Sequence, residues 1–194
     1  GYTRPSITPE IDLPKKMPDR LEFSQHIVPD FGEVLLVNGA IEDGDADRFA
    51  AYIEDAGEPE LIALNSPGGL VEEALTIGRL VREKEVDTVI LAGMFCVSAC
   101  PYILAGGVER TVSHDGAVGM HQHYYDASVL LPAFLAVRDV QFGQGRTMEF
   151  LIEMGIDPGV MLHSLRTQPR RIYVLNRAEL EDSRMATHII DAPE

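Results

Sequence analysis

Tryptophan is absent from this 194-residue chain, and cysteine occurs only twice, at Cys96 and Cys100. Basic residues are also scarce: 16 Lys and Arg stand against 31 Asp and Glu, which gives a formal charge of −15. The best basic runs are Lys15-Lys16 and Arg170-Arg171, which are too short to neutralise a phosphate backbone. We therefore expect no nucleic-acid partner.

Long hydrophobic runs are missing as well. No apolar stretch reaches the roughly 18–20 residues that a membrane helix needs, and no signal peptide is visible. The chain begins at Gly1 instead of a methionine, which leaves room for a targeting or anchoring segment before residue 1. Any membrane anchor is expected to lie outside this sequence.

The two cysteines flank Ser98 at a spacing of four. Two thiols do not supply the four ligands of a structural zinc site, so we expect no metal here. The spacing is compatible with a local disulfide in an oxidising compartment. It is equally compatible with two small buried thiols, the commoner state of cysteine, and the sequence leaves both open.

The chain does contain a hydrophobic fraction of 45% with 17 Gly and 12 Pro, which is typical of a turn-rich α/β domain. Residues 1–30 hold five prolines and little apolar periodicity, which predicts an extended arm or linker, with a single domain over residues 31–194. The alternation of apolar runs and amphipathic segments predicts mostly parallel strands joined by helices. Strands are expected at 33–38, 61–65, 87–92, 109–113, 117–120 and 171–175, and helices at 46–56, 69–85, 98–106, 138–154, 157–165 and 178–182, with a closing segment at 186–191.

Ser98 follows a predicted strand and tight turn and starts a helix, with Pro101 in the first helical turn. A hydroxyl at that point lies near unbonded helix N–H groups, which suits the nucleophile of an acyl transfer. A serine in this position is, by itself, more typical of a helix N-cap. The G-x-S-x-G pattern of a nucleophile elbow is absent, because Cys96 and Cys100 take the glycine places.

The turn at residues 65–69 and a histidine pair add two further candidate groups. Gly68 and Gly69 follow a buried strand and let backbone N–H groups approach a ligand, although such a pair is often a plain turn. His121 and His123 end a predicted strand, and we expect at most one of them to act at a given site. The other histidines have no catalytic context: His26, His114, His163 and His188.

Four short motifs occur in order: NSPGG at 65–69, CVSAC at 96–100, ILAGG at 103–107 and VGMHQ at 118–122. Together they resemble the ClpP family of serine peptidases, within the ClpP/crotonase fold, over residues 33–123. The resemblance implies a spiral of mostly parallel strands wrapped by helices. The details are similar to a divergent bacterial branch that usually carries an N-terminal anchor or export signal.

The resemblance also implies roles for individual residues. Ser98 is the nucleophile, and His121 is the general base because it is the histidine followed by glutamine; His123 is a lesser alternative. The oxyanion hole consists of the backbone N–H groups of Gly69 and Ala99, and Gly68 holds the turn.

The third catalytic member departs from the family. The family has an aspartate where this chain has Ser164, and no acidic residue lies between Pro158 and Asn176. His121 is therefore left in a dyad, is oriented by a backbone group or the Ser164 hydroxyl, or recruits another carboxylate such as Asp126. Loss of the orienting acid implies a weak enzyme.

The expected function is a serine-type peptidase or related acyl hydrolase that acts on a peptide or protein without a cofactor. The alternatives are a catalytically degenerate scaffold or binding module and a crotonase-like acyl-CoA enzyme; residues 61–81 offer only Arg79 to CoA phosphates. The resemblance implies a homo-oligomer, with residues 129–134 and 138–154 as contact regions. It also implies a periplasmic or membrane-tethered location facing the periplasm, with the cytoplasm as the alternative.

Overall fold

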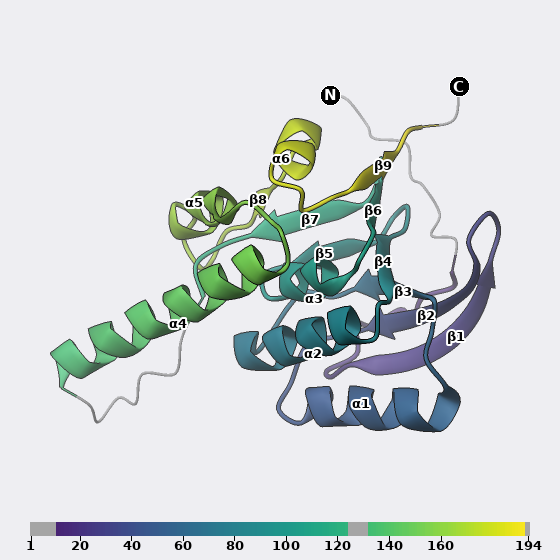
Figure 1. Cartoon of the computed structure of the whole chain (residues 1–194), viewed down its shortest axis with the longest axis horizontal. Helices are drawn as coiled ribbons and strands as arrows, with labels where there is room; N and C mark the ends of the chain where they lie inside the picture. Colours follow the sequence, from purple (N-terminus) through teal and green to yellow (C-terminus); the bar gives the residue numbers. More distant parts are fainter. Residues whose placement is uncertain (1–10, 124–131, 193–194) are drawn as a thin grey trace.

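The computed structural model describes residues 11–123 and 132–192. In these ranges the chain forms a six-stranded sheet in the order β1-β2-β3-β4-β6-β9. Only the β1–β2 pair is antiparallel, and the other four pairs are parallel. The predicted α/β class with a mostly parallel sheet is confirmed (Figure 1). The strands are β1 (Glu22–Val28), β2 (Gly32–Asn38), β3 (Leu61–Asn65), β4 (Asp87–Ile90), β6 (Arg110–Ser113) and β9 (His188–Ile190).

The central strands are continuous apolar runs, as expected where both faces of a sheet are covered. Residues 34–37 of β2, 62–64 of β3 and 89–90 of β4 are all buried. Helix α1 (Asp45–Ala56) connects β2 to β3, and α2 (Val71–Glu83) connects β3 to β4. These two helices lie side by side below the sheet in Figure 1.

A second sheet of three strands, in the order β5-β7-β8, carries the segments of the candidate site. Strand β5 (Phe95–Val97) runs parallel to β7 (Ala117–Met120), and β8 (Tyr173–Val174) runs antiparallel to β7. A single bridge between Ser66 and Cys96 ties this sheet to the turn after β3. The carboxyl ends of β3, β5 and β7 are thereby brought together.

Helix α3 (Cys100–Gly106) follows β5, and all seven of its residues are buried. It packs closely on α2, because a Cβ atom at Gly106 would lie only 2.2 Å from the Gly78 carbonyl oxygen. Two guanidinium groups bind the carbonyls at its carboxyl end. Arg82 donates to Ala105 and Gly106 at 3.0 and 2.9 Å, and Arg110 donates to Gly107 at 2.9 Å. Burial lowers the pKa of Arg110 to about 10, so this side chain remains charged at neutral pH and complements the helix dipole.

Helix α4 (Ala133–Glu153) is the longest helix, and only its second half packs on the domain. Its buried residues are Gly143, Thr147, Phe150 and Leu151, whereas the first half projects from the body (Figure 1). It begins earlier than the predicted residue 138. In the described ranges, no helix is long and apolar enough to cross a bilayer. The remaining helices are the 3₁₀ turn η1 (Pro158–Val160), α5 (Met161–Leu165) and α6 (Arg177–Asp182).

The predicted arm over residues 1–30 needs correction, because residues 22–28 form β1. Its apolar pattern is weak because β1 is an edge strand with most of its side chains exposed. The preceding segment is also anchored, since Leu21 is buried and donates its N–H to the Asp45 carboxylate at 3.1 Å. Gly44 is the N-cap of α1, and the Asp45 side chain binds Arg20 and Arg48.

Candidate active site

Ser98 lies in the turn between β5 and α3 with a φ of +62°. A non-glycine residue in this left-handed region costs roughly 1–2 kcal/mol, so the surrounding structure has to hold it there. On the strand side, the Ser98 N–H donates to Gly119 at 3.0 Å and the Val97 N–H donates to Ser66 at 3.1 Å. Strain held in this way is characteristic of functional turns.

The Ser98 hydroxyl meets the imidazole of His121, which follows β7. The Oγ atom of Ser98 lies 2.7 Å from Nε2 of His121. On the other side of the ring, Nδ1 lies 3.1 Å from the backbone carbonyl oxygen of Arg171. A carbonyl only accepts, so Nδ1 carries the proton in the neutral ring and Nε2 presents its lone pair to the serine. This is the tautomer that a general base needs.

Gly68 lies directly against the Ser98 turn, and Gly69 follows it on the side of Ile41. Gly68 has a φ of +92°, and a Cβ atom there would lie 2.4 Å from the Ser98 Cβ and 2.8 Å from the Ala99 nitrogen. The glycine turn is fixed from behind, since the Ile41 N–H donates to Gly68 at 2.8 Å. Within the described residues, neither the Gly69 nor the Ala99 N–H donates to another group. Both N–H groups are thus unbonded, one directly after Ser98 and the other directly after Gly68.

A segment from α5 to β8 holds the histidine in place. The Ser164 hydroxyl donates to the His121 backbone carbonyl at 2.6 Å. The neighbouring Gln122 donates its N–H to Thr167 at 2.9 Å and its side-chain amide to Leu165 at 2.7 Å. These contacts place the end of β7 on the same segment that supplies the Arg171 carbonyl.

The two candidates for the third catalytic member have different outcomes. Ser164 reaches the backbone of His121 and does not contact the imidazole, so its predicted role in orienting the ring needs correction. Asp126 lies outside the described residues. The group that meets Nδ1 is the Arg171 carbonyl, which corresponds to the backbone alternative.

His123 lies next to His121 but has a different partner. Its Nε2 lies 2.8 Å from the Tyr102 hydroxyl, and its ring meets His121 edge-on at 5.9 Å. Burial, assisted by the charge of His121, lowers the pKa of His123 to about 4. His123 is therefore a neutral, partly buried neighbour of the site, and its Nε2 atom meets the Tyr102 hydroxyl and not the serine that a general base would deprotonate.

Cys96 and Cys100 are joined by a disulfide, with a Cα–Cα distance of 5.1 Å. Both residues are fully buried. The bond links β5 to the first residue of α3, across the turn that carries Ser98.

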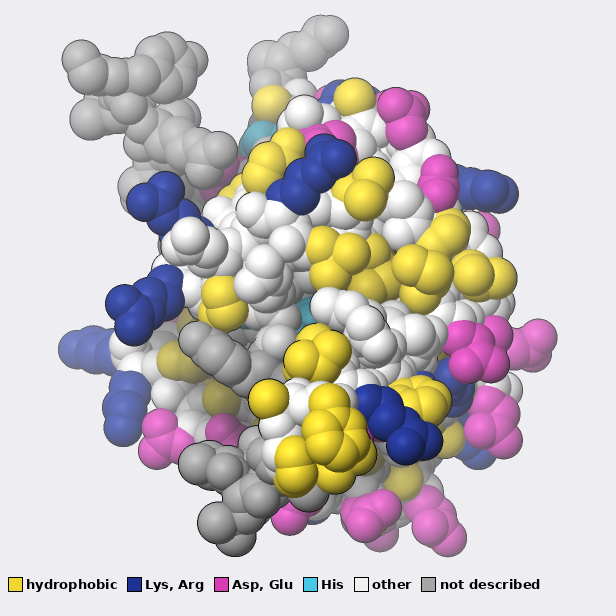
Figure 2. Space-filling model, turned by 90° about the vertical axis from the view of Figure 1, so that its left-hand side faces the viewer, with side chains coloured by type: hydrophobic (Ala, Val, Ile, Leu, Met, Phe, Trp, Pro, Cys, Tyr) yellow, Lys and Arg dark blue, Asp and Glu magenta, His cyan; other side chains and the backbone are white. Residues whose placement is uncertain are grey.

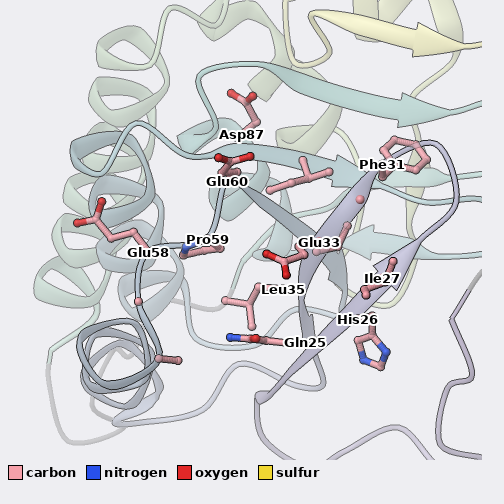
Figure 3. A pocket seen from close by; sticks show the side chains of 15 residues that line it. Gln25, His26, Ile27, Phe31, Glu33, Leu35, Glu58, Pro59, Glu60 and Asp87 are labelled. Carbon is pink, nitrogen blue, oxygen red and sulfur yellow. The ribbon is translucent and has the colours of Figure 1, made fainter.

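A hollow of about 790 Å³ lies elsewhere, between the β1–β2 hairpin and the starts of β3 and β4. Glu58, Glu60 and Asp87 line one side of it, and Glu33, His26 and Ile27 of the hairpin line the other (Figure 3). The Ser98 site is at the carboxyl ends of the parallel strands, so this acidic hollow does not serve it. A smaller cavity of about 90 Å³ lies beside the site, between Gln122, His123 and α4 to α5.

Of the residues predicted from the sequence, the structure brings Ser98 into contact with His121 and places Gly68 against Ser98 and Ala99, with Gly69 next in the chain. The sequence did not identify Arg171 as the source of the backbone acceptor, nor Gln122 as an anchor. Every residue has a backbone carbonyl, so residue type cannot reveal which one accepts from the histidine. Gln122 directly follows His121 in the sequence, and this position was the available signal for its anchoring role.

No group of three or more His, Cys, Asp or Glu side chains in the described ranges is arranged to hold a metal ion. Comparison with known proteins identifies no family, since no protein-family model matches the chain and no curated protein matches it.

Proposed function

We propose that the chain is a serine-type acyl hydrolase, most closely a peptidase of the ClpP kind, that uses Ser98 and His121. The observation that carries the proposal is the 2.7 Å contact between Ser98 Oγ and His121 Nε2, in a strained turn next to two unbonded N–H groups. A helix-capping serine explains neither feature, because α3 has no side-chain cap hydrogen bond.

The proposed reaction follows from the proton positions. His121 takes the hydroxyl proton at Nε2 as Ser98 Oγ attacks the substrate carbonyl carbon. The Gly69 and Ala99 N–H groups bind the developing oxyanion, and His121 then returns the proton to the leaving amine or alcohol. Water, activated by the same histidine, hydrolyses the acyl-enzyme and restores the serine.

The acceptor at Nδ1 limits the rate. The Arg171 carbonyl fixes the ring and its tautomer, but it adds no negative charge to stabilise the imidazolium. We therefore infer a slow hydrolase. The same observation favours a second candidate, a ClpP-like scaffold or binding module without catalytic activity.

We infer the ClpP/crotonase arrangement for the fold, on the basis of the motif order and the parallel sheet with helical crossovers. We also infer a homo-oligomer with α4 in the contact. Figure 2 shows the face toward which the free half of α4 points, where hydrophobic side chains gather in several clusters. The exposed apolar residues of α4 are Phe134, Val137, Phe142, Met148 and Ile152.

For location, we infer an oxidising compartment such as the periplasm. The buried disulfide supports this inference, because such bonds persist mainly outside the reducing cytosol. The substrate would be a peptide or protein.

A fluorophosphonate probe tests the proposal directly. The purified chain is expected to form a covalent adduct that peptide mapping places on Ser98, and to hydrolyse small esters or an unfolded protein substrate. Ser98→Ala and His121→Ala should each abolish the adduct, whereas Ser24→Ala, an exposed serine in β1, should not.

Two results would decide against the hydrolase. One is the absence of any Ser98 adduct in folded, oxidised protein, and the other is ester hydrolysis that survives Ser98→Ala. The first result, with the fold intact by circular dichroism, would favour the scaffold.

A further inference from the structure

We propose that the Cys96–Cys100 disulfide is a positioning element for catalysis, which holds Ser98 and the Ala99 N–H in their reactive geometry. This inference rests on the proposed hydrolase function. It assigns the cysteine pair a role in the chemistry of the neighbouring serine, in addition to any role in stability.

The bond closes a short loop over residues 96–100, with Ser98 at its centre. One end is in β5 and the other is the first residue of α3. The loop therefore sets the distance and angle between the strand that leads into the nucleophile and the helix that leaves it.

Hydrogen bonds hold this turn on one side only. Before the helix, Val97 and Ser98 donate to Ser66 and Gly119. After Ser98, the Ala99 N–H has no partner within the described residues, and the first bond is from the Tyr102 N–H to the Ala99 carbonyl. An oxyanion donor has to stay unbonded in the free enzyme, so another constraint must fix its direction. The disulfide supplies that constraint immediately after Ala99.

Stability alone accounts poorly for the placement. A disulfide that closes a very short loop removes little freedom from the unfolded chain. The same bond restrains the folded turn strongly, because Ser98 has a φ of +62° and an unrestrained serine favours other backbone regions.

The sulfur atoms are inside the core, since both cysteines are 0% exposed. A reductant therefore reaches the bond only when the turn opens. We infer that the bond forms during folding and persists, so the active form requires an oxidising environment while the chain folds and does not switch in the folded state.

The test compares oxidised protein with protein reduced by dithiothreitol in mild denaturant and refolded without oxygen. The dithiol gives two electrons and two protons to the disulfide, which leaves two cysteine thiols, and is itself released as a cyclic disulfide. Mass spectrometry and thiol counting verify each state. The rate of fluorophosphonate labelling of Ser98 is then measured as a function of probe concentration. The temperature is kept well below the lowest melting temperature of the proteins compared.

We expect the maximal labelling rate of the reduced protein to fall about 10- to 100-fold, with little change in the half-saturating probe concentration, because a misplaced nucleophile slows the chemical step. Reoxidation with oxidised glutathione should restore the rate. The double variant Cys96→Ala/Cys100→Ala should show the same loss of labelling rate, and oxidised glutathione should not restore it. If the reduced chain does not refold, this variant takes its place in the comparison. Ile53→Val in α1, a buried position outside the turn, should lower stability without lowering the rate.

Equal maximal rates in oxidised and reduced protein, or in oxidised protein and the folded double variant, would overturn the positioning role and leave the hydrolase intact. A failure of oxidised protein to label at Ser98 would overturn the hydrolase itself, and the positioning role with it.

Discussion

The backbone carbonyl of Arg171 accepts from His121 Nδ1 at 3.1 Å, at the place where a serine hydrolase commonly has a carboxylate. The ring is thus oriented by a peptide group whose position depends on the turn between α5 and β8. That turn is fixed by the Arg171 N–H, which donates to Gln168 at 2.9 Å, and by the bonds from Gln122 to Thr167 and Leu165. The imidazole is thus oriented without a negative charge beside it.

Gly68→Ala is expected to lower ester hydrolysis at least about 100-fold, because small displacements of reacting groups have large effects on rate. The new Cβ atom would lie 2.4 Å from the Ser98 Cβ and 2.7 Å from the Val97 carbonyl oxygen. The turn would have to move away from the glycine pair. Steady-state kinetics and probe labelling measure the loss.

Gly145→Ala in α4 is the matched control. No atom lies within 4 Å of the added methyl group, and Gly145 is within a helix. It should leave the rate unchanged and stabilise the helix by roughly 0.5–1 kcal/mol. A Gly68→Ala variant as active as Gly145→Ala would contradict the close packing of the glycine turn on Ser98.

Ser164→Ala is expected to act mainly on stability. The Ser164 side chain is buried and donates to the His121 carbonyl, so its removal leaves that carbonyl without this partner and costs roughly 1–3 kcal/mol. Urea unfolding measures the cost. Activity should fall far less than in His121→Ala, because the Arg171 carbonyl still orients the ring; an equal loss would assign Ser164 to the catalytic group.

The lowered pKa of His123 is expected to make the folded protein less stable at acidic pH. Its pKa is lowered from 6.5 to about 4 by burial and by the charge of His121. Between these values the unfolded chain binds a proton that the folded chain does not bind. The contribution to stability is therefore complete above pH 6.5 and is lost as the pH falls toward 4, by about 3 kcal/mol.

Denaturant unfolding at pH 7 and pH 4 measures this loss. His123→Gln, which keeps a polar group near Tyr102, should lose about 3 kcal/mol less than the wild type over the same interval. The exposed His188→Gln should behave like the wild type. An equal loss of unfolding free energy between pH 7 and pH 4 in all three proteins would show that His123 does not cause it.

The exposed apolar side chains of α4 are expected to be needed for the proposed oligomer. Val137 and Ile152 are 56% and 57% exposed, on a helix whose first half has little contact with its own domain. Val137→Glu/Ile152→Glu should shift sedimentation toward smaller species at equal concentration, because charges in an apolar contact are costly. Ser24→Glu/Thr76→Glu adds the same charge outside α4 and should leave the distribution unchanged. An unaltered distribution in the α4 variant would exclude this face.

The strands that bracket the site were the most predictable part of the fold. Residues 61–65 and 117–120 form β3 and β7 with the predicted bounds, because each is a short apolar run ended by a turn. Strand β5 was not separated from the Ser98 turn, since it has only three residues and its pairing with β7 is long-range. Helix α4 begins at Ala133, directly after its N-cap Pro132, and so starts five residues before the predicted position.

The parts of the candidate site that depend on residue type could be predicted from the sequence. A serine, a histidine and two glycines are visible in the sequence. The disulfide remained one of two alternatives, because its geometry depends on how β5 meets α3. The Arg171 carbonyl lies 50 residues from His121 and depends wholly on the tertiary fold.

The burial of α3 and its two arginine contacts also have a consequence for local unfolding. Amide protons in this helix should exchange with solvent only when the whole domain opens, whereas those in the first half of α4 should exchange through local fraying. The Ser98 turn is thus attached to the part of the molecule that opens last. In the proposed oligomer, contacts through α4 would therefore form and break without displacing the proposed nucleophile.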